Sequence, residues 1–259
     1  MKKIIILLGV AILTLTSCST ENETPVTNSP EVVLLVKRII GNDVSKIVYD
    51  GSKIVKIEKA GSSSFYTYTG NIITKITSTE GDKTNITELI YENGRLTTTL
   101  KKTSNGSNAT LVNSSKKEFI YDMAGNVTIK KYYYSAGIPT ISETSKITIK
   151  DGNIVRVEHL DASGTTTEVN VYEYDTRENP ISHTAGYIKL VDPNSSSKNN
   201  ILKTITTVGS GATASVSVTT NVFILNNYGY PLSVRSTRVV YNLSGSNPQS
   251  DEYSVQYEY

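Results

Sequence analysis

The sequence predicts an all-β protein, a repetitive antiparallel β-meander of about 16 strands curled into a barrel-like or spiral shell. Three observations predict this fold. A short turn containing Gly recurs along the chain, the segments between turns are rich in Tyr, Ile, Val and Thr, and these segments alternate between apolar and polar residues. No segment after Cys18 keeps the period of an amphipathic helix.

The recurring unit is a strand that ends in Tyr, a turn of Asp or Asn with Gly, and an apolar residue that opens the next strand. Gly, Asn and Asp adopt positive φ at the lowest steric cost, so they mark the reversal of a hairpin. The β-branched and aromatic residues beside each turn suit a pleated, half-buried surface. Versions of the unit are found at Tyr49–Ile54, Tyr68–Ile72, Tyr91–Leu96, Tyr121–Val127, Asp151–Ile154, Tyr174–Ile181 and Asn226–Leu232.

This pattern resembles the YD repeats of the RHS family, and the whole chain resembles the YD-repeat-like lipoproteins of Bacteroidetes. The resemblance covers the chain from Ile47 to Pro231, although the repeats here vary in length and lack most of the Arg-Tyr dipeptides of long RHS arrays. It implies a β-rich surface protein. It does not carry over a toxin shell or any catalytic residue.

A second class of turn is polar and alternates along the chain with the first class. In an antiparallel meander, the two classes should therefore lie at opposite ends of the strands. No helix is predicted to cover the apolar face, so the sheet must close into a shell or fold into two layers. The polar turns are Ala60–Ser63, Glu80–Asp82, Ser104–Ser115, Ser135–Gly137, Ala162–Gly164, Asp192–Asn200, Gly209–Gly211 and Ser244–Ser250.

The alternation also predicts which side chains are buried. The apolar run Val32–Val36, with Ile39 and Ile40, reads as a strand enclosed by its neighbours. Later strands should bury their apolar face and expose the other. The faces expected to be buried include Ala214, Val216, Val218, Thr220, Val222 and Ile224 in one strand, and Val155, Val157 and His159 in another.

The N-terminus has the features of an export signal. Lys2 and Lys3 precede an apolar run that is too short to span a bilayer, and Leu15-Thr16-Ser17-Cys18 resembles a bacterial lipobox. We therefore expect residues 1–17 to be a lipoprotein signal peptide, residues 18–30 to be the lipidated Cys18 with a flexible tether, and residues 31–259 to be the β domain. The early acids Glu21 and Glu23 resemble export signals of Bacteroidetes lipoproteins. We predict that the protein is lipid-anchored in the outer membrane, on either its cell-surface or its periplasmic side.

Charge and cysteine content limit the possible partners. The chain has 26 basic and 24 acidic residues, so removal of the leader with Lys2 and Lys3 leaves the charges balanced. This balance argues against binding to nucleic acid. Cys18 is the single cysteine, so no disulfide within the chain is possible.

Tyrosine is unusually frequent, with 17 Tyr against 3 Phe and no Trp. One hypothesis is a ligand-binding strip for a glycan or a protein, formed by Tyr132, Tyr134, Tyr172 and Tyr174, because Tyr combines a flat apolar face with a hydroxyl group. The alternative is a set of cross-strand Tyr contacts that stabilise neighbouring repeats.

Catalysis is not predicted. The two histidines, His159 and His183, lack the spacing of a metal site or a catalytic triad, and His159 reads as a structural residue. The Gly-rich turns lack the features of a phosphate loop, and the Asp-containing turns lack the acid spacing of a calcium loop. We expect no enzyme activity, no metal and no cofactor.

The predicted function is therefore non-enzymatic binding of a glycan, peptide or protein partner by a lipid-anchored envelope protein. One alternative is a passive structural envelope protein. A second alternative is an outer-membrane β-barrel, favoured by the strand number and by the C-terminal aromatic residues Tyr257 and Tyr259.

Overall fold

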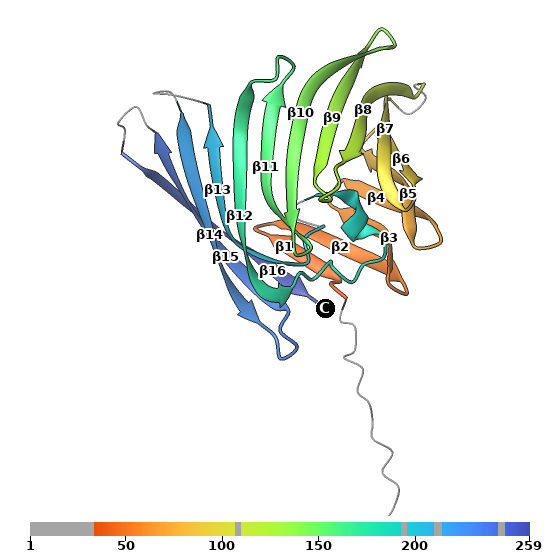
Figure 1. The fold of residues 1–259 in the computed structure, drawn as a ribbon. Helices are drawn as coiled ribbons and strands as arrows, with labels where there is room; N and C mark the ends of the chain where they lie inside the picture. Colours follow the sequence, from red (N-terminus) through yellow and green to blue (C-terminus); the bar gives the residue numbers. More distant parts are fainter. Residues whose placement is uncertain (1–33, 107–109, 193–195, 210–213, 243–246) are drawn as a thin grey trace, which may run out of the picture. The chain divides into compact units, whose positions relative to one another are not determined.

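The chain forms a closed antiparallel barrel of 16 strands in the computed structural model (Figure 1). The structure describes residues 34–106, 110–192, 196–209, 214–242 and 247–259. The described residues all belong to one compact unit. The predicted signal peptide, Cys18 and the tether lie outside the described residues. No helix in the described part of the chain is long and apolar enough to cross a membrane.

Each strand pairs with its neighbours in sequence, and the first strand pairs with the last to close the ring. The predicted all-β meander is therefore confirmed, and its closed form is settled. The elements are β1 (Lys37–Ile40), β2 (Asp43–Asp50), β3 (Lys53–Lys59), β4 (Ser62–Thr69), β5 (Ile72–Glu80), β6 (Lys83–Glu92), β7 (Arg95–Asn105), β8 (Val112–Tyr121), β9 (Val127–Ser135), β10 (Ile138–Lys150), β11 (Asn153–Asp161), β12 (Thr166–Glu178), the 3-10 helix η1 (Tyr187–Leu190), β13 (Asn199–Val208), β14 (Ser215–Leu225), β15 (Pro231–Asn242) and β16 (Gln249–Glu258).

The two classes of turn lie at opposite ends of the barrel, as predicted. Turns of the Tyr-Asp-Gly class follow the even-numbered strands, and most polar turns follow the odd-numbered strands. We call these the repeat end and the polar end. Gly51 and Gly70, at the repeat end, have φ of 58° and 59°, which explains why Gly is used there.

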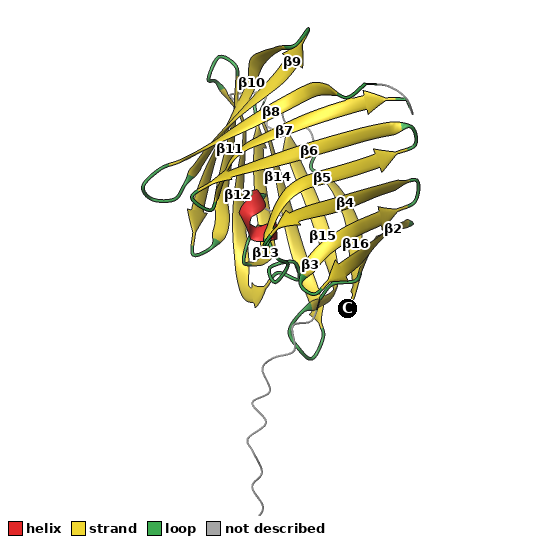
Figure 2. Cartoon of the chain, turned by 90° about the vertical axis from the view of Figure 1, so that its right-hand side faces the viewer, coloured by secondary structure: helices red, strands yellow, loops and turns green. Residues whose placement is uncertain are grey.

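Two details of the predicted meander are wrong. The described strand β1 spans only Lys37–Ile40, so Leu35 and Val36 lie before it, and Val36 is 42% exposed; Val32 and Val33 of the predicted run lie outside the described residues. The predicted polar turn at 192–200 lies at the repeat end, because the described residues between 179 and 198 form no strand that would carry the chain to the polar end. These residues instead fold inside the barrel, where η1 lies within the ring of strands (Figure 2).

The recurring unit has a clear structural role at the repeat end. In most units the first or second apolar residue after the turn is buried, as at Ile54, Ile73, Leu96, Val127 and Ile154, and Tyr49, Tyr68, Tyr91 and Tyr121 before the turns pack on the same core. At four places a Tyr hydroxyl donates a hydrogen bond to the backbone carbonyl of the buried residue in the preceding repeat, whereas the buried hydroxyls of Tyr49 and Tyr91 have no such bond within the described residues. Such bonds join Tyr68 to Ile54 at 3.0 Å, Tyr121 to Leu96 at 3.0 Å, Tyr174 to Ile154 at 2.6 Å and Tyr259 to Pro231 at 2.9 Å.

Register shifts next to these turns explain why the carbonyls need such a partner. The pairing shifts at Val48/Tyr49 between β2 and β3 and at Ile90/Tyr91 between β6 and β7, which leaves one extra residue in the later strand. A bulge of this kind interrupts the ladder of backbone hydrogen bonds. The Tyr hydroxyl from the next hairpin restores a bond at this place, so the repeats stabilise one another through their tyrosines.

Replacing Tyr121 with Phe should lower the free energy of unfolding by about 1–2 kcal/mol, because the half-buried Leu96 carbonyl loses its donor while the ring remains. Urea unfolding of both proteins measures this. Tyr134→Phe is the matched control, because no hydrogen bond of its hydroxyl is seen in the described part of the chain, and its stability should stay within about 0.5 kcal/mol. Equal stability of all three proteins would contradict this role of the repeat Tyr.

The predicted orientation of β14 is wrong. Its apolar residues Val222 and Ile224 face outward and are 63% and 64% exposed, whereas Ser217 on the other face is buried. The interior beside β14 is not filled by apolar side chains, so polar side chains such as Ser217 can face it. In β11 the alternation is reset by a register shift, so that Ile154 and Val157 are both buried and Val155 is the extra residue between them.

Candidate functional site: a pocket inside the barrel

The segment that joins β12 to β13 fills the repeat end of the barrel. We call its described residues, 179–192 and 196–198, the inner segment. Tyr187 anchors it: its side chain is 7% exposed, its ring centroid lies 5.9 Å from that of Tyr66, and its hydroxyl donates to the Tyr66 hydroxyl at 2.9 Å. Burial raises the pKa of both phenols well above the ordinary value. Both hydroxyls therefore stay protonated over the physiological pH range.

Backbone contacts tie the inner segment to several hairpins of the barrel. The Ala185 amide donates to the Ser52 carbonyl at 2.9 Å, and the Lys189 ammonium donates to the Gly94 carbonyl at 3.2 Å. Gly186 has a φ of 79°, and a Cβ at this residue would lie 3.0 Å from the Asn71 carbonyl oxygen. Only Gly fits this approach without strain.

The last residues of the inner segment are held by β11 and β12. Ser197 is almost fully buried, its hydroxyl accepts from the Ile154 amide at 3.2 Å, and it lies 2.9 Å from the Tyr174 hydroxyl. The Lys198 amide donates to the Gly152 carbonyl at 3.1 Å. The inner segment is thus an ordered part of the barrel interior, held by hydrogen bonds to the surrounding strands and turns.

A pocket of about 430 Å³ lies between the first residues of the inner segment and the wall formed by β13 to β16 and β1. This volume suits a small organic ligand. The apolar part of its lining is formed mainly by Leu35, Ile181, Ile201, Phe223, Val234 and Val255, and the polar part mainly by Arg38, Asn221, Ser236, Tyr253 and Tyr257.

Some polar side chains that line the pocket already form hydrogen bonds with neighbouring residues. The Asn221 amide donates to the Ile201 carbonyl at 2.8 Å, and its carbonyl oxygen accepts from the Ser236 hydroxyl at 2.7 Å. These bonds fix the wall. Arg38 differs, because no carboxylate pairs with its guanidinium among the ion pairs of the described residues. Burial raises the pKa of the Tyr257 hydroxyl, and the adjacent Arg38 charge partly opposes this rise.

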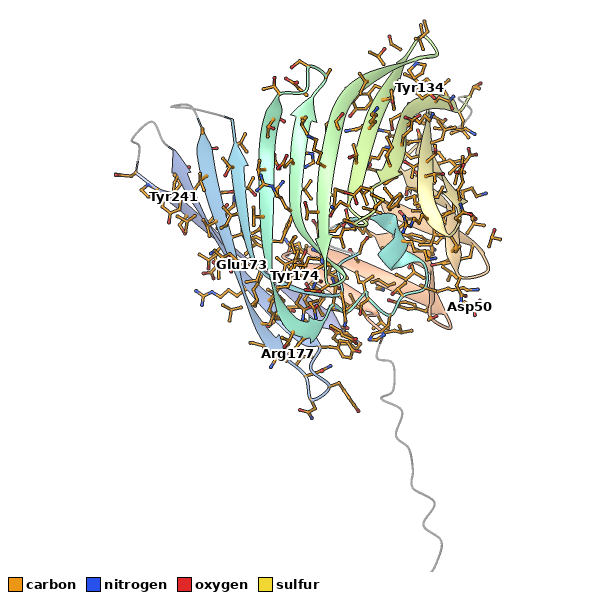
Figure 3. The ribbon with its side chains drawn as sticks, in the orientation of Figure 1. Asp50, Tyr134, Glu173, Tyr174, Arg177 and Tyr241 are labelled. Carbon is orange, nitrogen blue, oxygen red and sulfur yellow. The ribbon has the colours of Figure 1, made fainter. Side chains whose placement is uncertain are left out.

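The four tyrosines predicted to form one strip lie on two separate surfaces. Tyr132 and Tyr134 lie on the face of β9 opposite the buried Val127 and Ile129, and the Tyr132 hydroxyl donates to Glu118 at 2.9 Å. Tyr172 and Tyr174 pack inside, with ring centroids 6.5 Å apart. Figure 3 shows Tyr134 far from Tyr174, which lies beside the inner segment.

The two histidines are held by neighbouring side chains. His159 Nδ1 lies 3.0 Å from a Glu143 carboxylate oxygen and 3.0 Å from the Ser145 hydroxyl. His183 Nε2 lies 2.6 Å from a Glu178 carboxylate oxygen and 2.9 Å from the Tyr230 hydroxyl. No group of three or more His, Cys, Asp or Glu side chains in the described part of the chain could hold a metal ion.

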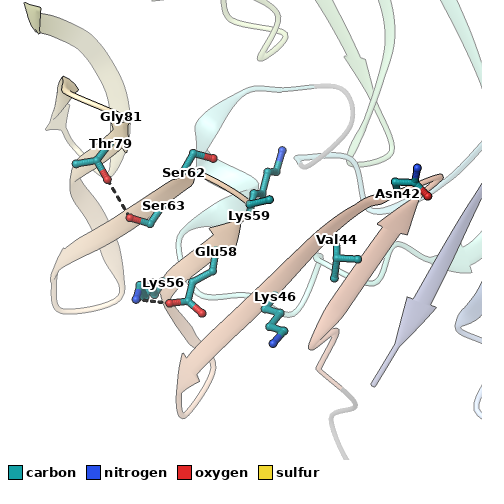
Figure 4. A pocket seen from close by; sticks show the side chains of 12 residues that line it. Asn42, Val44, Lys46, Lys56, Glu58, Lys59, Ser62, Ser63, Thr79 and Gly81 are labelled. Carbon is teal, nitrogen blue, oxygen red and sulfur yellow. Dashed lines mark hydrogen bonds and ion pairs between the residues drawn. The ribbon is translucent and has the colours of Figure 1, made fainter.

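A larger hollow, of about 750 Å³, lies near the polar turns at Gly61 and Gly81 (Figure 4). Its described lining includes Lys46, Lys56 and Lys59, and its apolar side chains are Val44 and Ala60 alone. Lys56 and Glu58 form an ion pair there, which holds the pKa of the Glu58 carboxyl below its usual value. The interior pocket combines apolar walls with a few polar groups, so it is the better ligand site.

The outer wall of the barrel carries charged pairs around most of its circumference. Strand alternation, counted with the extra residue at each register shift, places each of these residues on the face opposite the core. The pairs are Lys37–Glu258, Lys56–Glu58, Lys102–Glu88, Lys116–Glu118, Arg156–Glu158, Lys203–Glu173 and Arg235–Glu252.

The sequence missed both the inner segment and the pocket. The available signals were the Asn179-Pro180 pair, Gly186, and the absence of strand alternation between them. A long connection between hairpins is often functional. Nothing local in the sequence showed that this connection turns inward.

No protein-family model and no curated protein matches the sequence. Solved structures of similar fold include a porin-like protein from Bacteroides vulgatus, with a TM-score of 0.53 and 12% identity over 87% of this chain and 98% of that one. A porin-like protein from Bacteroides uniformis has a TM-score of 0.50 and 12% identity over 86% of this chain and 94% of that one. The chain therefore has the closed β-barrel fold of these porin-like proteins.

Proposed function

We propose that this protein is a lipid-anchored barrel of the outer membrane that binds a small ligand in its interior, without catalysis. The observation that carries this proposal is the pocket beside the inner segment, which has apolar walls and a few fixed polar groups. We therefore keep the predicted binding role, but we place the binding site in the interior pocket and not on the predicted Tyr strip. The lipid anchor at Cys18, the YD-repeat relationship and the surface location stay predictions.

The charged outer wall supports a barrel that faces water. The seven outward ion pairs are spread over ten of the strands, and their side chains are mostly part-exposed. A Lys or Arg facing lipid at the bilayer midplane costs about 2–4 kcal/mol. A water-facing barrel needs another means of attachment, and acylation at Cys18 would provide it.

Ligand binding can be tested with the neutral fluorescent probe N-phenyl-1-naphthylamine and the chain starting at Glu31. We expect saturable binding of one probe per barrel, because the pocket holds one small aromatic molecule. Val234→Trp, which fills the pocket, should abolish this binding. The control is Val222→Trp on the outer wall, which should bind as the unchanged protein does. Absence of saturable binding to the unchanged protein would contradict the proposal.

A second candidate is a barrel inserted in the outer membrane. The similarity to porin-like proteins favours it over the binding hypothesis, and outward apolar residues such as Ile90, Ile120, Val222 and Ile224 agree with it. This candidate predicts that the purified chain inserts into lipid vesicles and becomes resistant to added protease. Complete digestion in the presence of vesicles, under conditions that digest the chain in their absence, would contradict it.

A further inference from the structure

The interior pocket is chemically asymmetric. Arg38 in β1 and Tyr253 and Tyr257 in β16 provide donors on one side. Strand pairing supports this arrangement, because Arg38 lies directly opposite Tyr257. The rest of the lining includes the apolar residues Ile181, Ile201 and Phe223. The amides of Asn200 and Asn221 also lie there, and they are already hydrogen-bonded to Asp175 and Ser236. A ligand that fills the pocket would therefore have one polar end and one apolar end.

Arg38 gives the polar end its sign. Arg156 and Arg235, on the outer wall, are neutralised by Glu158 and Glu252 at 2.7 Å. Arg38 forms no ion pair with a carboxylate in the described part of the chain. No Asp or Glu is found among the described residues that line the pocket. A guanidinium binds carboxylate, sulfonate or phosphate oxygens through two parallel hydrogen bonds.

We propose that the pocket binds a small free amphiphile with one anionic group, held by Arg38 with the Tyr253 and Tyr257 hydroxyls. Its apolar body packs against Ile201, Phe223 and Val234. This inference rests on the proposed function, since it specifies the ligand class of the same pocket. Tyr253, which lines the pocket, is 48% exposed.

Two probes with the same aromatic skeleton test this inference. 1-Anilinonaphthalene-8-sulfonate carries an anionic group, and N-phenyl-1-naphthylamine is its neutral counterpart. With the chain starting at Glu31, the anionic probe should bind at least about tenfold more tightly than the neutral one, as expected for a charge-assisted contact. Arg38→Gln should remove this preference and leave the affinity for the neutral probe within about twofold.

Two further variants keep the test specific. Arg38→Lys retains the charge and should recover part of the preference, whereas Arg235→Gln on the outer wall should behave as the unchanged protein does. If the neutral probe binds but the anionic probe binds no more tightly, or Arg38→Gln weakens both equally, the anionic ligand class is wrong while interior binding stands. If the neutral probe does not bind the unchanged protein, the proposed function itself is wrong.

Discussion

Replacing Tyr187 with Ala is expected to lower the free energy of unfolding by about 3–5 kcal/mol, the usual cost of truncating a buried aromatic residue. The phenol fills the space beside Tyr66 and Ile73 at the repeat end, and its hydroxyl is the partner of Tyr66. The variant leaves a cavity and an unpaired Tyr66 hydroxyl. Urea unfolding followed by circular dichroism measures the loss.

Tyr228→Ala is the control for this experiment, because Tyr228 lies in an exposed turn with 68% of its surface accessible. Its stability should change by no more than about 0.5 kcal/mol. Tyr187→Ala should also weaken binding of N-phenyl-1-naphthylamine, because Asn179, Pro180 and Ile181 of the inner segment line the pocket. A Tyr187→Ala variant as stable as the control would mean that the inner segment is not docked as described.

Replacing Ile54 with Ala should cost about 2–5 kcal/mol, because Ile54 is fully buried among the aliphatic residues that follow the turns. The matched change Ile224→Ala on the outer wall should cost less than about 1 kcal/mol, the range of strand propensity alone. Both changes remove the same atoms from a β-strand. Equal losses, or a larger loss for Ile224→Ala, would contradict the assignment of inner and outer faces.

The local chemistry of the chain predicted the hairpins well. Turns such as Asp50-Gly51 and Thr69-Gly70 need positive φ, and this requirement can be read directly from the residue types. The meander and the approximate strand number follow from the order of these turns. Closure of the ring does not, because the pairing of β1 with β16 joins residues at the two ends of the domain.

It was harder to predict which face of each strand points into the barrel. In β14 a rule that buries the apolar face fails, because a wide barrel can keep polar residues such as Asn221 and Ser217 inside. Register shifts add a second difficulty, since one extra residue such as Val155 reverses the faces that follow it. The pocket could not be predicted, because Arg38, Ile181 and Phe223 come from distant parts of the sequence.

The central claim is that the outer wall of the barrel faces water and that its interior holds the functional site. The most direct test is sedimentation velocity on the chain starting at Glu31, purified without detergent. We expect a monodisperse species, because the seven outward ion pairs are compatible with water and unfavourable in lipid. A folded chain that aggregates in buffer and becomes monodisperse only in detergent would contradict this account and favour the membrane-inserted barrel.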